Sequence, residues 1–110
     1  IVKRKEVVHL KRILLVCSAG MSTSLLVTKM NLAAEKQGVK ADINAVAETE
    51  LNKYGDKVDV VLLGPQVRFL LSKVKAFLDP KGVPVEVINS IDYGTMNGEN
   101  VLKRAIELIG

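Results

Sequence analysis

The chain has 110 residues, 48% of them hydrophobic and 25% charged, a composition that excludes an intrinsically disordered protein. With one cysteine and one histidine it can form neither an internal disulfide nor a cysteine–histidine zinc site, and no metal or other cofactor is expected. The formal charge is +4, and the apolar runs are too short to cross a bilayer, so neither membrane insertion nor a secretory signal is expected. One domain in a reducing cytoplasm is the expected setting.

The basic excess is confined to the amino terminus. Five Lys and Arg residues and one Glu fall within the first 12 positions, which accounts for the whole net charge and leaves the remainder neutral. Only 4% of the residues are aromatic and none is Trp, so a basic face with stacking rings, and hence a nucleic-acid partner, is not expected. Residues 1–10 are predicted to be an amino-terminal extension and residues 11–110 the domain.

The first half of the chain predicts two strands separated by a long helix. Residues 13–16 form a continuous apolar run, which is typical of a strand buried on both faces. Residues 22–37 carry apolar side chains at helical spacing, with Ser and Thr as capping residues at the start and Gly38 after the end. Residues 40–45 alternate between polar and apolar, the pattern of an edge strand, and the polar stretch 48–57 could hold one short helix.

The second half repeats this alternation of strands and helices. Residues 58–63 are almost wholly apolar and predict a second central strand. Apolar residues at helical spacing over 67–78 predict one helix, which ends at the Asp-Pro pair that follows. Residues 83–87 predict a short edge strand, and an apolar stripe within residues 101–109 predicts the last helix.

Strands and helices that alternate through a short chain predict right-handed crossovers and a parallel sheet, an α/β fold. The two continuous apolar strands belong at the centre and the other two at the edges, which predicts a single doubly wound four-stranded sheet in the order 2-1-3-4, with helices on both faces. In such sheets a ligand lies beyond the carboxyl ends of the strands, where the winding reverses, here between the first and third strands. Cys17, directly after the first strand, falls at that point.

The segment from Cys17 to Ser24 joins the first strand to the long helix and consists mainly of small and hydroxyl-bearing residues. Backbone amides of such a loop, with the positive end of a helix, can cradle a phosphate group, and Gly20 permits a tight backbone. The same field favours the thiolate form of a cysteine, so a nucleophile and a phosphate cradle would coincide. The alternative is that Cys17 only ends a buried strand. The candidate phosphate-binding residues are Ser18, Ala19, Gly20, Met21, Ser22, Thr23 and Ser24.

Three segments in the same order resemble the enzyme IIB component of the bacterial sugar phosphotransferase system, of the lactose, cellobiose and chitobiose type. They are residues 15–26, which include the cysteine loop, residues 59–66, and residues 84–88 with the Tyr93-Gly94 pair after them. The resemblance covers nearly everything after residue 11. It implies a four-stranded parallel sheet, in agreement with the pattern of strands and helices.

The resemblance also implies a function for the loop. The family's cysteine at the position of Cys17 accepts a phosphoryl group from a phosphohistidine of the IIA component and transfers it to a sugar bound by the membrane component IIC during uptake. The sugar implied is a β-linked disaccharide such as cellobiose, chitobiose or lactose. The chain would then be a cytoplasmic phosphotransferase that needs no metal, because the loop amides would stabilise the transferring group.

A small cysteine-dependent phosphatase is the alternative function, because such enzymes use a similar strand, loop and helix. They require an arginine six positions after the cysteine, and Thr23 occupies that position here. Asp92 could serve as the general acid of a phosphatase or be an exposed turn carboxylate. A receiver-like module is disfavoured, because it needs acidic residues where this chain has Cys17 and Gly64.

Two further polar residues, Gln66 and Tyr93, stand just past later strands of the predicted sheet. They are either rim residues of the site or an ordinary loop cap and a packing ring. His9, the only imidazole, lies outside the core pattern and is expected to be incidental.

Overall fold

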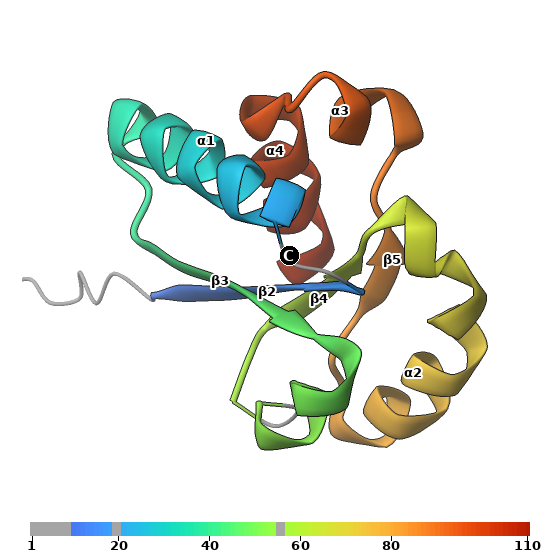
Figure 1. Ribbon diagram of the computed structural model, residues 1–110. Helices are drawn as coiled ribbons and strands as arrows, with labels where there is room; N and C mark the ends of the chain where they lie inside the picture. Colours follow the sequence, from blue (N-terminus) through green and yellow to red (C-terminus); the bar gives the residue numbers. More distant parts are fainter. Residues whose placement is uncertain (1–9, 19–20, 55–56) are drawn as a thin grey trace, which may run out of the picture.

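The computed structural model describes residues 10–18, 21–54 and 57–110, and its centre is a parallel four-stranded sheet (Figure 1). The strands are β2 (Lys11–Cys17), β3 (Ala41–Ala47), β4 (Val60–Leu63) and β5 (Val85–Val87), in the order β3-β2-β4-β5. Counted along the chain this is the order 2-1-3-4, so the predicted α/β fold and strand order are confirmed. The extension over residues 1–10 stays a prediction, and His9 lies outside the described residues.

The central and edge strands differ in burial as their residue patterns predict. Residues 13–17 of β2 and all of β4 are buried, whereas β3 and β5 each bury only one residue. Both β4 and β5 begin two residues later than predicted. Before β4, the carboxylate of Asp59 accepts a hydrogen bond from Arg12 N at 2.8 Å, and before β5, Pro84 has no N–H to contribute to a ladder.

Helices cover both faces of the sheet (Figure 1). On one face lie α1 (Met21–Gln37), α3 (Ser90–Gly94) and α4 (Gly98–Ile109), and on the other lie α2 (Leu71–Leu78) and the 3₁₀ helix η1 (Glu48–Lys53). The first predicted helix is confirmed and starts one residue earlier, and η1 falls within the stretch predicted to hold a short helix. Gly38 ends α1 with a φ of 71°, a left-handed conformation that glycine adopts without strain.

The helix predicted over residues 67–78 consists of two elements, so that prediction is wrong in part. The chain first forms a 3₁₀ turn, η2 (Pro65–Leu70), and α2 follows. Within η2, Val67 has non-helical angles, with φ −118° and ψ 24°. Val67 and Leu70 are both buried and stand three positions apart, a spacing that suits a 3₁₀ helix as well as an α-helix over so short a stretch.

A short helix that the sequence analysis did not predict, α3, follows β5. Asn89 caps it, because its side-chain oxygen accepts hydrogen bonds from the N–H groups of Ile91 at 2.9 Å and Asp92 at 3.1 Å. Asn97 caps α4 in the same way through the N–H of Asn100 at 3.0 Å. Asn is a favoured cap residue, so these two positions were the available sequence signal. Asp92 therefore lies in the first turn of a helix rather than in an exposed turn.

Two hydrophobic clusters fill the space on either side of the sheet, one beneath α1 and α4 and the other beneath α2 and η2. The two long helices of the first face approach closely at Gly98. A Cβ atom added there would lie 2.5 Å from the carbonyl carbon of Lys29 and 2.6 Å from the backbone nitrogen of Met30. Only glycine allows α4 to begin at this distance from α1.

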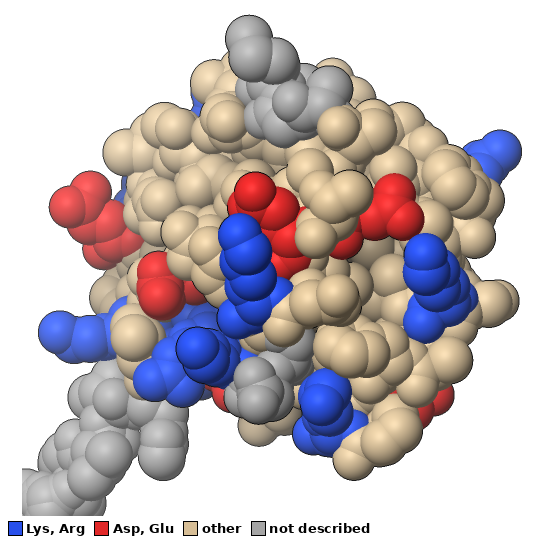
Figure 2. All heavy atoms as spheres, turned by 60° about the horizontal axis from the view of Figure 1, so that its bottom comes forward, with Lys and Arg blue, Asp and Glu red and all other residues tan. Residues whose placement is uncertain are grey.

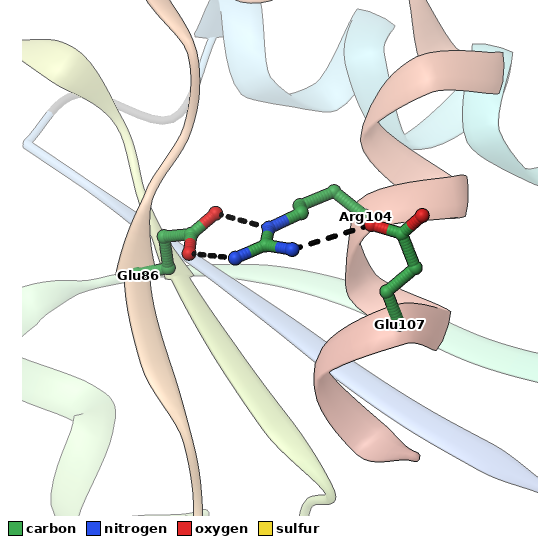
Figure 3. A network of polar contacts seen from close by, with 3 residues as sticks. All are labelled: Glu86, Arg104 and Glu107. Carbon is green, nitrogen blue, oxygen red and sulfur yellow. Dashed lines mark hydrogen bonds and ion pairs between the residues drawn. The ribbon is translucent and has the colours of Figure 1, made fainter.

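An ion-pair network ties α4 to the edge strand β5 (Figure 3). Arg104 donates from Nε and Nη2 to the two carboxylate oxygens of Glu86, both at 2.7 Å, and from Nη1 to Glu107 at 3.2 Å. These hydrogen bonds hold the pKa of Glu86 below its ordinary value and raise the pKa of Arg104. The Arg104 and Glu86 side chains are 51% and 35% exposed, so water screens the pair and its contribution to stability is small.

Candidate functional site

The candidate site is built at one edge of the sheet, where β2, β4 and β5 end side by side. Val16 pairs with Leu63, and Leu63 pairs with Val87, so the three strands are in register at their carboxyl ends. Two hydrogen bonds continue this register, from Gly64 N to Val16 O at 2.9 Å and from Ile88 N to Leu63 O at 2.8 Å. The segments that follow the three strands therefore start next to one another.

Cys17 is the last residue of β2 and lies where the winding of the sheet reverses. The chain after β2 passes to α1 on one face, whereas the chain after β4 passes to α2 on the other (Figure 1). Cys17 is a free thiol and is fully buried, with 0% exposed. Its predicted position at the end of the first strand is confirmed, and its side chain lies below the molecular surface.

The predicted phosphate-binding loop enters α1 directly. Ser18 is exposed in a bend after β2, Ala19 and Gly20 lie outside the described residues, and Met21 and Ser22 are the first residues of α1. The N–H groups in the first turn of a helix have no intrahelical acceptor and lie at its positive end, so they suit an anion. The first turn of α1 contains no acidic residue that would oppose one.

A group of three polar side chains, which we call the hydroxyl cluster, joins the segments after β2, β4 and β5. Thr23, in the first turn of α1, is buried with only 1% exposed. Its Oγ1 lies 3.4 Å from Oη of Tyr93 in α3, within hydrogen-bond distance. Gln66 of η2 donates from Nε2 to the same Tyr93 oxygen at 3.1 Å. The two candidate rim residues are thus connected to each other and to the predicted loop, which the sequence analysis did not foresee.

Gln66 reaches Tyr93 because its side chain folds back over Gly64. A Cβ atom added at Gly64 would lie 2.6 Å from Oε1 of Gln66. Because Gly64 has no side chain, the side-chain amide of Gln66 can occupy the space at the end of β4.

Asp92, considered as a general acid in the sequence analysis, makes a different contact. Its Oδ1 accepts a hydrogen bond from Asn100 Nδ2 at 3.1 Å, which ties α3 to α4. It also lines a cavity of about 250 Å³ beside β5, together with Glu86 and Arg104, and Cys17 is not among the lining residues. This carboxylate has a structural contact that explains it without catalysis.

Three large apolar side chains, which we call the apolar rim, are exposed on the same three segments. They are Leu25 in α1, Phe69 in η2 and Ile91 in α3, with 51%, 75% and 74% exposed. Single exposed apolar residues are ordinary, and these three are distinguished only by lying on segments that start side by side. They could not be predicted from the sequence, because apolar spacing alone does not reveal which side chains remain in water.

On the face drawn in Figure 2, several described Lys and Arg side chains lie together at the lower left, with Asp and Glu side chains next to them, and other Lys and Arg side chains stand singly. The described residues of that face form no continuous basic surface for a nucleic-acid backbone. Among the described residues there is no group of three or more His, Cys, Asp or Glu that could hold a metal ion. Within the same part of the chain, no helix has the length and apolar character needed to cross a membrane.

The sequence matches the family described as "PTS system, Lactose/Cellobiose specific IIB subunit" over residues 12–104. It is 43% identical over 100 residues to the oligo-β-mannoside-specific EIIB component of Bacillus subtilis (strain 168), a match that covers 91% of this chain and 97% of the relative. It is also 43% identical over 104 residues to the cellobiose-specific EIIB component of Lactococcus lactis subsp. lactis (strain IL1403), covering 90% and 96%.

Solved structures agree with this assignment. The solution structure of a cellobiose-specific phosphotransferase IIB component from Borrelia burgdorferi superposes with a TM-score of 0.77 at 50% identity, covering 92% of this chain and 93% of that one. The lactose-specific IIB domain of Streptococcus pneumoniae has a TM-score of 0.82 at 19% identity, covering 91% and 98%, and so shows the shared fold alone. The chain therefore belongs to the lactose/cellobiose-specific IIB family of the phosphotransferase system and is a phosphotransferase of sugar uptake.

Proposed function

We propose that Cys17 carries the phosphoryl group in this phosphotransferase, with residues 18–24 as its phosphate-binding loop. It accepts the group from a phosphohistidine of the IIA component and transfers it to a sugar bound by the membrane component IIC. The main support is the position of the chain's only cysteine, which ends β2 shortly before the amino terminus of α1. The helix dipole and the first-turn N–H groups favour a phosphoryl group there.

The transfer consists of two in-line displacements at phosphorus. In the first, the Cys17 thiolate attacks, the S–P bond forms, and the N–P bond to the IIA histidine breaks with its electron pair returning to the imidazole. In the second, a sugar hydroxyl attacks, the O–P bond forms, the thiolate leaves, and the hydroxyl proton passes to a base of the acceptor complex. The protein mainly positions the group and stabilises the charge on its three equatorial oxygens, a task suited to backbone N–H groups.

The sugar is proposed to be a β-linked disaccharide such as cellobiose, chitobiose or lactose. Relatives at 43% identity are named for oligo-β-mannoside and cellobiose, and a galactose-specific relative from Lactococcus lactis subsp. cremoris (strain MG1363) is equally similar. The oligo-β-mannoside and cellobiose names support a β-linked glycoside as the class, whereas galactose is a monosaccharide. In this proposal the IIC component, and not this chain, holds the sugar and selects it.

Membership of the family implies contact with other components of the phosphotransferase system. We propose that the IIA and IIC components dock in turn on the apolar rim, in the cytoplasm. Support comes from the exposed side chains of Leu25, Phe69 and Ile91, which lie on the segments next to Cys17. Docking would remove these side chains from water and bring a donor or acceptor to the thiol.

The experiment that tests the proposal is an intact-mass measurement. The chain is incubated with the general phosphotransferase proteins, the cognate IIA component and phosphoenolpyruvate, and one phosphoryl addition that maps to Cys17 is expected. No addition in the presence of demonstrably phosphorylated IIA would contradict the proposal.

The alternative phosphatase function is separated by a second measurement. Thr23 stands at the position of the phosphatase arginine and is buried in the hydroxyl cluster. Without that guanidinium group, a free aryl phosphate should bind poorly. We expect negligible hydrolysis of an aryl phosphate by the wild-type chain without IIA, and robust turnover would favour the phosphatase.

A further inference from the structure

We infer that Tyr93 is a positioning residue for phosphoryl transfer, which acts through Thr23 to hold the first turn of α1 in place at the site. The inference rests on the proposed function of Cys17 and adds a component to it. The contact between Oη of Tyr93 and Oγ1 of Thr23 joins residues 70 positions apart in the sequence. It therefore ties α3 to the start of α1, two elements that the chain itself does not hold together.

The burial of Thr23 explains why this contact matters. A buried hydroxyl that lacks a hydrogen-bond partner costs free energy, because it has given up its contacts with water. Thr23 is only 1% exposed, so water is a poor substitute for Tyr93. The orientation of Thr23 is consequently coupled to the place of the Tyr93 oxygen.

Gln66 in turn fixes the Tyr93 oxygen. Its Nε2 donates to that oxygen at 3.1 Å, and its side chain is folded over Gly64, where no Cβ competes for the space. Tyr93 accepts this hydrogen bond, and in its contact with Thr23 either hydroxyl can be the donor. The hydroxyl cluster thus anchors α1 to the ends of β4 and β5.

The anchored turn is the one that faces the phosphoryl group in the proposed mechanism. Thr23 is the third residue of α1, so its N–H is among those without an intrahelical acceptor. Such groups stabilise a transition state only when they are held close to the productive geometry, since a small misplacement weakens every hydrogen bond to the equatorial oxygens. Tyr93 would supply this positioning without touching the phosphoryl group.

The test uses Tyr93→Phe, Thr23→Val and the double variant, each of which removes hydroxyl groups and keeps the shape. Tyr54→Phe, at the chain's other tyrosine, and Thr28→Val, at an exposed threonine of α1, are the matched controls. Single-turnover transfer from phosphorylated IIA is followed by rapid quench at several IIA concentrations. This separates the maximal rate constant from the half-saturating concentration.

We expect each single variant at the cluster to lower the maximal rate constant about tenfold, the effect of one lost hydrogen bond of ordinary strength. The half-saturating concentration and the rates of the two controls should stay within about twofold of wild type. The double variant should be no slower than the slower single variant, because both substitutions break the same contact. Thr23→Ser, which keeps the hydroxyl, should restore most of the rate.

Three results would overturn the inference. A wild-type rate in Tyr93→Phe would leave the hydroxyl without a role. A raised half-saturating concentration with an unchanged maximal rate would make Tyr93 a docking residue. Losses that multiply in the double variant would mean that Tyr93 and Thr23 act independently, as they would if Tyr93 touched the phosphoryl group itself.

A second readout separates this inference from the proposed function. Protection of Cys17 from iodoacetamide by inorganic phosphate needs no IIA component, and Tyr93→Phe should raise the half-protecting phosphate concentration several-fold. If the wild-type chain accepts no phosphoryl group from phosphorylated IIA, the proposed function fails while this readout still tests the positioning role. Equal protection of the wild-type and Tyr93→Phe chains would overturn the inference even if transfer occurs.

Discussion

Two groups of polar side chains connect distant parts of this protein, and they differ in charge, exposure and place. The hydroxyl cluster is neutral, includes the buried Thr23, and has contacts of 3.1 and 3.4 Å at the carboxyl ends of the strands. The network around Arg104 is charged, partly exposed, and has contacts of 2.7 and 3.2 Å between β5 and α4. The shortest contacts, at 2.7 Å, are thus those of the charged network, which does not include a residue of the hydroxyl cluster.

In this protein, contact strength and functional importance are separate properties. Water competes with an exposed ion pair, so losing it changes little, whereas a buried hydroxyl has no such replacement. Substitutions at the carboxyl-end edge should therefore change transfer more than stability. Substitutions where α4 packs against α1 at Gly98 should change stability, those in the Arg104 network should change it only slightly, and both should leave transfer by the folded protein intact.

Cys17→Ser is expected to have the largest effect on transfer, because it removes the proposed nucleophile at the carboxyl end of β2. A serine hydroxyl is a far weaker nucleophile than a thiolate, so transfer from phosphorylated IIA should fall to background, at least about a thousandfold. Because the residue is buried, the new hydroxyl should lower the free energy of unfolding by at most about 3 kcal/mol. Rapid-quench transfer and urea unfolding measure the two effects, and transfer above a few per cent of wild type would contradict the role of Cys17.

Gly98→Ala, in contrast to Cys17→Ser, should lower stability without changing transfer. The added methyl group would meet the backbone of Lys29 and Met30, which cannot move aside as a flexible side chain can. We expect the free energy of unfolding to fall by about 1–3 kcal/mol, as for other overpacked sites. Gly94→Ala is the matched control, because a Cβ atom there has no neighbour within 4 Å.

The rate of phosphoryl transfer shows whether the effect of Gly98→Ala is confined to stability. Per folded molecule, the variant should accept the phosphoryl group at the wild-type rate below its unfolding transition. A stable but inactive variant would mean that the packing of α1 against α4 belongs to the site.

Phe69→Ala tests the apolar rim and should act on docking alone. Its ring is 75% exposed and stabilises the isolated chain little, but its burial against a partner would contribute to affinity. The half-saturating concentration of phosphorylated IIA should rise about tenfold with an unchanged maximal rate. Phe77→Ala, at the chain's other phenylalanine in α2, is the control and should leave that concentration unchanged. Equal effects of the two variants would show that the apolar rim does not contact the IIA component.

Much of the fold could be predicted because burial on both faces leaves a clear pattern in the sequence. The continuous apolar runs became the central strands β2 and β4, and the less regular segments became the edges, which was enough to order the sheet. The break between η2 and α2 could not be predicted, because apolar residues three apart fit either helix type. The position of Cys17 followed from the strand order alone.

The hydroxyl cluster could not be predicted from the sequence. Gln66 and Tyr93 were candidates because they follow strands, but their connection depends on the fold-back over Gly64 and on α3, whose cap at Asn89 was overlooked. Nor does the sequence distinguish a buried Thr23 from the exposed Ser24 beside it. Such contacts arise only when three strand ends meet.

Glu86→Gln is expected to have the smallest effect on stability. The pH dependence of that effect tests the role of the ion-pair network around Arg104. Hydrogen bonds from Arg104 hold the pKa of Glu86 below its ordinary value of 4.5 in the folded chain. A carboxylate of this kind stabilises the fold at pH values above 4.5, and its contribution disappears as the pH falls through the lowered pKa, because the folded form must then take up the proton.

The wild-type chain should therefore have a slightly higher urea midpoint than Glu86→Gln at pH 7, and the difference should vanish in acid. Arg104 stays protonated throughout, since its pKa is raised, so the trend reports the carboxylate alone. Glu50→Gln, at an exposed residue of η1, should show no such trend. Transfer from phosphorylated IIA at pH 7 should be the same in wild type and Glu86→Gln, because the hydrogen bonds of Glu86 go to Arg104 and not to the hydroxyl cluster. A midpoint difference that persists or grows as the pH falls would contradict the assigned role of the ion pair, and a loss of transfer would show that β5 and α4 take part in the site.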